Sequence, residues 1–213
     1  MLAILLVVEI ILLIVAVRFG KNYLFGLAAI NMLSIAAFPL KIINLGFLNS
    51  NIGTVWYSVV FAVQLIVLIQ FGIVSSKELV NKLVFILIGF FLIVQTSASV
   101  PAYLGLGGDV LSAVSNRSLR VAAASLLAFV IGQAVLVLVY VKLHKLYFFP
   151  RYIVATVFGQ LVDSLLFFPL AFSDWVLYTQ ILWHGFALKV IFGTCFAPIV
   201  YYEARKSTNF DNG

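Results

Sequence analysis

One face of an apolar stretch of the chain carries side chains that can bind a solute. Its members recur at i, i+4, i+7, i+8 and i+11, the spacing of one face of an α-helix: Thr156, Gln160, Asp163, Ser164 and Phe167. Hydroxyl, amide and carboxylate groups can donate or accept hydrogen bonds, and an aromatic ring offers an apolar surface. The spacing therefore predicts a binding face with Asp163 as its charged group.

Asp163 needs a partner, because an ionised carboxylate at the centre of a bilayer costs on the order of 3 kcal/mol on insertion scales unless it faces protein, water or an opposite charge. Lys189 lies at a similar depth in the next apolar segment, and we predict that it pairs with Asp163. Glu9, in the middle of the first apolar segment, is an alternative partner for Lys189 or a proton carrier. Interhelical hydrogen bonding is the structural alternative for Thr156, Gln160 and Ser164.

Further polar residues lie in the other apolar segments. The candidates are Gln133, Ser125 and Arg120 in the fifth segment, Gln64 and Tyr57 in the third, and Lys41 at the end of the second. Packing, interfacial anchoring or contact of a long basic side chain with lipid headgroups explains several of them equally well. They are therefore expected to be secondary members of the site.

The composition requires a bilayer around these residues. The chain has 213 residues, of which 64% are hydrophobic and 9% charged. A helix of about 20 apolar residues crosses the hydrocarbon because it satisfies all its own backbone hydrogen bonds. Apolar runs occur at residues 2–17, 23–40, 54–74, 79–100, 118–141, 152–172 and 176–201. We therefore expect an all-α membrane protein, a bundle of about seven transmembrane helices.

The distribution of basic residues predicts the topology. With seven spans, one side collects Arg18, Lys21, Lys77, Lys82, Lys142, Lys145, Arg151, Arg205 and Lys206, and the other has Lys41, Arg117 and Arg120. Because cytoplasmic loops are enriched in Lys and Arg, the amino terminus is expected outside and the carboxyl terminus inside. Residues 1–206 form one transmembrane domain in this interpretation, followed by a flexible polar tail at 207–213.

Several classes of protein do not fit the sequence. Cys195 is the only cysteine, and His144 and His184 stand apart, so neither a disulfide nor a metal site is expected. The net charge of +6 comes from basic residues scattered singly, which does not indicate nucleic-acid binding. No phosphate-binding loop and no hydrolase motif is present, so ATP hydrolysis and enzymatic activity are not expected, and we predict no cofactor.

A short motif occurs twice, in adjacent predicted helices. Gly132-Gln133 lies in the sequence FVIGQAVL, and Gly159-Gln160 lies in VFGQLVD. Internal repeats with a binding site at their interface are common in transporters. The pair indicates a weak internal repeat.

Two stretches, residues 120–133 (RVAAASLLAFVIGQ) and 156–167 (TVFGQLVDSLLF), carry a family resemblance together with Lys189, Pro198 and Tyr201. On these residues nearly the whole chain resembles the queuosine precursor transporter family, also called the vitamin uptake transporter family. It departs from the family's usual acidic residues at Leu65, Ile69 and Leu136.

The resemblance implies import of 7-deazaguanine precursors of queuosine (preQ0 or preQ1) across the cell (inner) membrane, without nucleic-acid partners. In a site of this kind, the carboxylate of Asp163 can accept hydrogen bonds from a guanine-type N–H and amine, and glutamine amides can pair with the remaining edge. The alternative is a membrane subunit that binds a vitamin-like solute and needs a separate energising partner.

Overall fold

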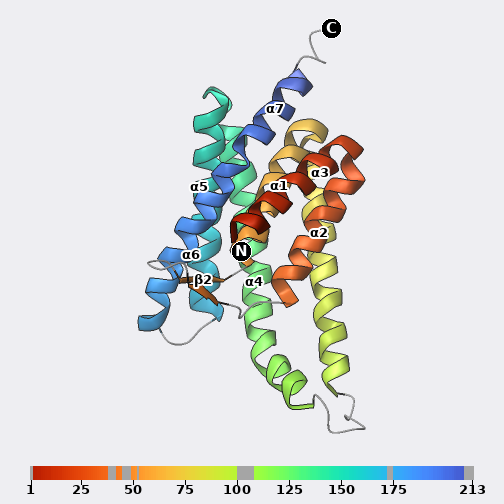
Figure 1. Cartoon of the computed structure of the whole chain (residues 1–213), viewed down its shortest axis with the longest axis vertical. Coiled ribbons are helices and arrows are strands. Elements are labelled where there is room, and N and C mark those ends of the chain that lie inside the picture. Colours follow the sequence, from red (N-terminus) through yellow and green to blue (C-terminus); the bar gives the residue numbers. More distant parts are fainter. Residues whose placement is uncertain are drawn as a thin grey trace.

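The computed structural model describes residues 2–37, 42–44, 49–51, 53–99, 108–171 and 175–208. The candidate site residue Lys41, most of the glycine-rich stretch at 101–109 and the end of the predicted tail lie outside these residues. The described helices are α1 (Leu2–Phe19), α2 (Lys21–Ala37), α3 (Gly53–Ser99), α4 (Gly108–Lys142), α5 (Phe148–Ala171), α6 (Trp175–Cys195) and α7 (Ala197–Thr208). They pack as a bundle (Figure 1), which confirms the predicted all-α class.

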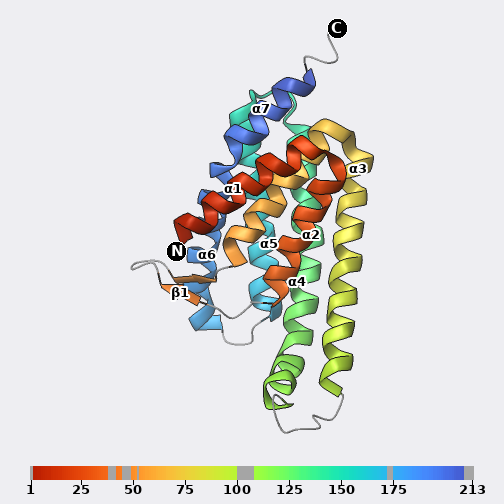
Figure 2. The same ribbon diagram turned by 45° about the vertical axis from the view of Figure 1, so that its right-hand side comes forward.

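A short antiparallel hairpin, not anticipated from the sequence, precedes α3. It joins β1 (Ile42–Asn44) to β2 (Asn49–Asn51), with Ile43 opposite Ser50. The hairpin lies beside α6, near the start of α3 (Figure 2).

Four helical stretches of the described chain are long and apolar enough to cross a membrane: Thr54–Ile93, Ala123–Lys142, Phe148–Ala171 and Leu182–Glu203. The first has 40 residues. A straight helix of that length would measure about 60 Å, twice the hydrocarbon thickness. The stretch instead turns back at Gly72, whose φ of 79° and ψ of −179° are open almost only to glycine. Its two halves therefore correspond to the third and fourth predicted spans.

The remaining helices agree with the prediction of about seven. α1 and α2 have 18 and 17 residues, close to the lower limit for crossing a bilayer. α1 runs obliquely across α2 and the first half of α3 (Figures 1 and 2). α6 and α7 follow one another in the same direction, with a short break at Phe196.

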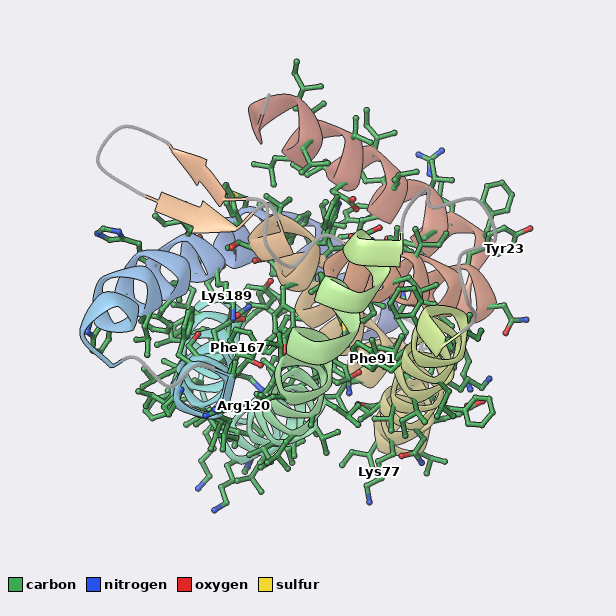
Figure 3. The ribbon with its side chains drawn as sticks, turned by 90° about the horizontal axis from the view of Figure 1, so that it is seen from below. Tyr23, Lys77, Phe91, Arg120, Phe167 and Lys189 are labelled. Atoms are coloured by element: carbon green, nitrogen blue, oxygen red, sulfur yellow. The ribbon has the colours of Figure 1, made fainter. Side chains whose placement is uncertain are left out.

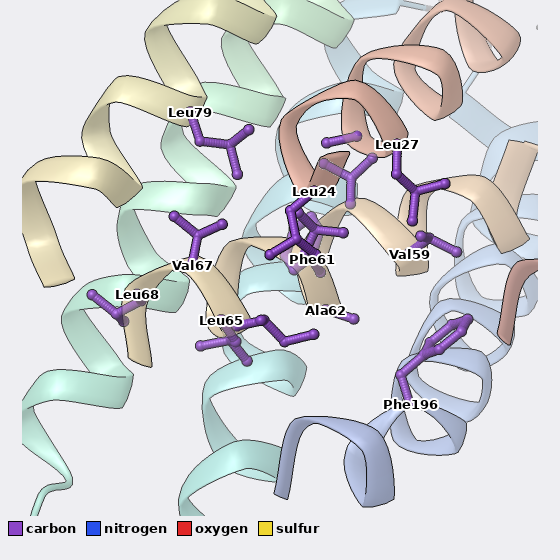
Figure 4. Packing of buried hydrophobic residues seen from close by; sticks show 14 of the residues in the cluster. Leu24, Leu27, Val59, Phe61, Ala62, Leu65, Val67, Leu68, Leu79 and Phe196 are labelled. Carbon is purple, nitrogen blue, oxygen red and sulfur yellow. The ribbon is translucent and has the colours of Figure 1, made fainter. Parts of the chain in front are cut away.

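The first half of α3 forms the centre of the bundle. Its side chains are buried on every face, including Val59, Val60, Phe61, Ala62 and Leu65, each at most 1% exposed. A helix that is apolar all around must be covered on all sides. Phe61 and Leu65 pack with Leu24 and Leu27 of α2 and with Phe196 in the core of Figure 4. This helix positions the residues next to Asp163.

The basic residues gather at one end of the bundle. The end of α1, the turn in α3, the α4–α5 connection and α7 all lie there (Figure 1). They carry Arg18, Lys21, Lys77, Lys82, Lys142, Lys145, Arg151, Arg205 and Lys206, which we call the basic end. Arg120 lies toward the opposite end, where its Nε donates to the carbonyl oxygen of Leu170 at 2.7 Å. The nine residues predicted to share one side therefore lie at one end and Arg120 lies toward the other, whereas Lys41 and the side chain of Arg117 lie outside the described part of the chain.

Candidate functional site

Asp163 lies at the centre of a buried polar cluster between α3, α5 and α6. Its side chain is 3% exposed, and its Oδ2 atom lies 2.6 Å from Nζ of Lys189, whose side chain is 11% exposed. The predicted ion pair is therefore confirmed. The alternative, Glu9, does not pair with Lys189. Because the two opposite charges are paired, neither is an uncompensated charge in the low-dielectric interior.

Tyr57 of α3 completes the surroundings of the carboxylate. Its hydroxyl donates a hydrogen bond to Oδ1 of Asp163. The ammonium of Lys189 lies 4.6 Å from the centre of the Tyr57 ring and donates to Oγ of Ser164 at 3.4 Å. The Tyr57 ring meets that of Phe129 edge-on, with centroids 6.2 Å apart. Three helices therefore hold the two charges in a fixed geometry.

Two glutamines beside this cluster have unused hydrogen-bonding capacity. Gln133 of α4 and Gln160 of α5 are both 0% exposed. Within the described part of the chain, neither the amide nitrogen nor the amide oxygen of either residue has a hydrogen-bond partner. A buried polar group left unsatisfied costs about 1–3 kcal/mol. Four such atoms beside a buried carboxylate are what a site for a polar solute requires.

The two Gly-Gln motifs meet where α4 crosses α5. A Cβ atom on Gly132 would lie 2.9 Å from Cβ of Asp163 and 3.1 Å from the carbonyl oxygen of Gly159. A Cβ atom on Gly159 would in turn lie 3.1 Å from the carbonyl oxygen of Gly132 and 2.9 Å from the Phe61 ring. The contact is reciprocal, as expected for related positions on two antiparallel helices. The absence of side chains lets the two backbones approach at this crossing, and Gln133 and Gln160 each follow one of the two glycines.

The other predicted residues are placed less centrally. Thr156 is buried against α6, where a Cβ on Gly193 would lie 2.9 Å from its methyl group. Ser125 is half-buried on α4. Viewed along the bundle in Figure 3, Phe167 and Arg120 lie in the same sector as Lys189, away from Tyr23 and Lys77.

The side chain of Gln64 forms its hydrogen bonds to another residue of α3. Its amide nitrogen donates to Oγ of Ser76 at 2.6 Å and to the Ser76 carbonyl oxygen at 3.2 Å, across the Gly72 turn. The amide N–H groups of Gln64 therefore join the two halves of α3.

Three buried hydrogen bonds of the bundle were not identified from the sequence. Oγ of Ser58 donates to the backbone carbonyl oxygen of Lys189 at 3.1 Å and fixes α6 against α3. Asn31 of α2 donates from Nδ2 to Glu9 at 3.3 Å. Tyr152 donates to the carbonyl oxygen of Gly193 at 2.8 Å, one helical turn beyond Thr156. Small polar residues in helices are common, and their spacing alone does not single these out.

A cavity of about 820 Å³ opens at the basic end. It is lined by residues of α3, α4, α5 and α7, among them Tyr140, Arg151, Tyr201 and Arg205. Tyr152 is 1% exposed and directly follows Arg151, a cavity-lining residue, on α5. Thr156 comes one helical turn later on the same helix. The Asp163 cluster itself is nearly closed to solvent, since the side chains of Asp163 and Lys189 are 3% and 11% exposed. The described residues hold no group of three or more His, Cys, Asp or Glu side chains that could bind a metal ion.

Comparison with known proteins identifies the family. Residues 51–203 match the family model described as "Putative vitamin uptake transporter". The match spans α3 to α7 and includes every residue of the Asp163 cluster. No curated protein and no solved structure matches the chain. The chain belongs to the vitamin uptake transporter family.

Proposed function

We propose that this membrane transporter imports a queuosine precursor, a 7-deazaguanine base, and binds it at the Asp163 cluster. The observation that carries the proposal is the conjunction of a buried carboxylate with two buried, unpartnered carboxamides, those of Gln133 and Gln160. A guanine-type base presents N–H donors and an acceptor on one planar edge. The cluster offers the complementary groups.

The carboxylate of Asp163 has unused hydrogen-bond acceptor positions for such a base. A carboxylate accepts about four hydrogen bonds, and two are in use, one from Tyr57 and one from Lys189. The ring N–H and the exocyclic amine of the base can take the other positions as charge-assisted bonds. The Tyr57 and Phe129 rings supply apolar surface beside the carboxylate.

The glutamines can bind the remaining polar groups of the base. Each carboxamide has two donor hydrogens and one acceptor oxygen, so one of Gln133 and Gln160 can donate to the carbonyl of the base, and the other can accept from the pyrrole N–H on its opposite side. Pairing with the base would remove the cost of leaving these groups unsatisfied, which is about 1–3 kcal/mol for each. An apolar solute would leave that cost in place.

Transport requires the closed cluster to open to each side in turn. The cavity at the basic end supports an exit there, since Arg151 and Phe148, which line it, precede Tyr152 and Thr156 on the same helix. The concentration of Lys and Arg at this end supports its assignment to the cytoplasm, with the carboxyl terminus inside and the amino terminus outside. We propose the cell (inner) membrane as the location, as expected for an importer of this family.

Rescue of queuosine in tRNA tests the proposal. Cells that lack both precursor synthesis and their own importer receive this chain and low concentrations of preQ0 or preQ1. We expect the wild-type chain to restore queuosine and the Asp163→Asn variant, present at equal levels in the membrane, to fail. Glu78→Gln is the matched control, because Glu78 is a 40% exposed acid at the basic end and should be dispensable.

Two results would count against the proposal. A well-expressed wild-type chain that gives no queuosine, but binds the base when purified, would favour a binding subunit that needs an energising partner. Absence of both rescue and binding would exclude 7-deazaguanines as substrates.

A further inference from the structure

Glu9 is a second buried acid that the substrate cluster does not use. It lies in the middle of α1 and is 5% exposed, while Val7, Val8, Ile11 and Leu12 of the same helix are 43–54% exposed and face outward. A carboxyl group inside a membrane bundle is energetically costly, so a buried one is a candidate functional group. The side chains that face Glu9 indicate what that function is.

The neighbours of Glu9 are neutral. Asn31 of α2 donates to it from Nδ2 at 3.3 Å, and the indole N–H of Trp56 on α3 is its second hydrogen-bond donor. Within the described part of the chain Glu9 forms no ion pair, and the ammonium on α6, that of Lys189, is held by Asp163. The charge of Glu9 is therefore balanced only by N–H dipoles.

Asn31 can serve both protonation states of this carboxyl group. Its Nδ2 donates to the carboxylate, whereas its Oδ1 is buried and has no hydrogen-bond partner among the described groups. If Glu9 binds a proton, its O–H can donate to Oδ1 after the amide turns over. A group that stabilises the carboxylate in one orientation and the acid in the other favours reversible proton binding. Two N–H donors are, by contrast, poor ligands for a metal cation, which prefers oxygen.

Three consecutive residues of α3 connect Glu9 to the substrate cluster. Trp56 bonds to Glu9 of α1, Tyr57 donates to Asp163 of α5, and Ser58 donates to the carbonyl oxygen of Lys189 on α6. A change of charge at Glu9 would act on its bond to Trp56, and the next two residues of α3 bond to both members of the ion pair.

We infer that Glu9 is the binding site for a coupling proton, which drives uptake of the base bound at Asp163. The inference rests on the proposed function. One proton binds Glu9 from the outer side, α3 shifts with it, and the proton leaves to the cytoplasm in the inward-open state. The ligand of this second site is the proton itself, and the base does not contact Glu9.

Proteoliposomes with purified chain test the inference in two steps. Exchange of labelled for unlabelled preQ1 at equal pH measures binding and alternation without net proton movement. Accumulation driven by an imposed pH gradient, acid outside, measures coupling. We expect Glu9→Gln to keep exchange within about twofold of the wild type and to lose the stimulation by the gradient. Glu9→Asp should regain part of the stimulation.

A matched control is Glu203→Gln. Glu203 is 7% exposed but is bonded to Gln70 at the basic end, away from Trp56, and its variant should keep the gradient response. A Glu9→Gln chain that still accumulates base under the gradient, or a wild type that exchanges base but ignores the gradient, overturns the inference alone. A wild type without exchange overturns the proposed function, and this inference with it.

Discussion

Replacing Lys189 with methionine should destabilise the protein more than replacing both members of its ion pair. The single change leaves Asp163 charged, 3% exposed and bonded only to Tyr57. Removing one partner of a buried ion pair costs about 3–5 kcal/mol, whereas replacing both by uncharged groups can be nearly neutral. We therefore expect about 3–5 kcal/mol for Lys189→Met and clearly less for Asp163→Asn/Lys189→Met.

The single change Asp163→Asn should destabilise the protein less than Lys189→Met and more than the double change. Its Lys189 keeps the hydroxyl of Ser164 at 3.4 Å and the ring of Tyr57 at 4.6 Å, so the stranded ammonium retains partial compensation. The asymmetry between the two single variants follows from the number of partners that each stranded charge keeps.

Unfolding of the purified chain by SDS in lipid–detergent micelles, followed by tryptophan fluorescence, measures these differences. The exposed pair Lys82–Glu78, with side chains 53% and 40% exposed, is the control, and its single and double variants should unfold close to the wild type. A double variant at Asp163 and Lys189 that is no more stable than Lys189→Met would refute energetic coupling of the buried pair.

Three further changes follow from the packing. Gly132→Ala should destabilise by about 1–3 kcal/mol because its Cβ would lie 2.9 Å from that of Asp163, whereas Gly89→Ala, with nothing within 4 Å, should be neutral or stabilising in the same unfolding assay. Gly72→Ala should cost about 1–3 kcal/mol by straining a φ of 79°, which the same assay measures. Tyr152→Phe should cost about 1 kcal/mol by removing one buried hydrogen bond, and an unchanged unfolding midpoint would contradict that bond.

The sequence predicted the helices and the main ion pair well. Long apolar runs have few alternatives to membrane helices, and counting residues inward from each surface placed Asp163 and Lys189 at the same depth. The Gly72 turn was harder to predict. The polar residues Ser76 and Glu78 indicate a break between two spans, but in the structure they are helical and the chain turns earlier, at Gly72. The depth of a residue in the membrane can be estimated from the sequence, whereas the backbone conformation at a glycine cannot.

The partners of the buried polar groups were only partly predictable. Spacing along one helix put Gln160 and Asp163 on one face, but it does not say which neighbouring helix supplies the next group. Tyr57 was a secondary candidate, yet it bonds directly to Asp163. Gln64, a candidate of similar standing, bonds to Ser76. Rotation of each helix about its axis decides such pairings, and it depends on the packing of the whole bundle.

Equilibrium binding of matched bases to the purified chain tests the central claim most directly. We predict that 7-deazaguanine binds about ten- to a hundredfold more tightly than the analogue without the exocyclic amine, since one charge-assisted hydrogen bond to Asp163 is worth about 1.5–3 kcal/mol. Asp163→Asn should weaken 7-deazaguanine binding and largely remove the preference. Equal binding of both bases by the wild-type chain, or an unchanged preference in the variant, would contradict the assignment of Asp163 as the residue that recognises the base.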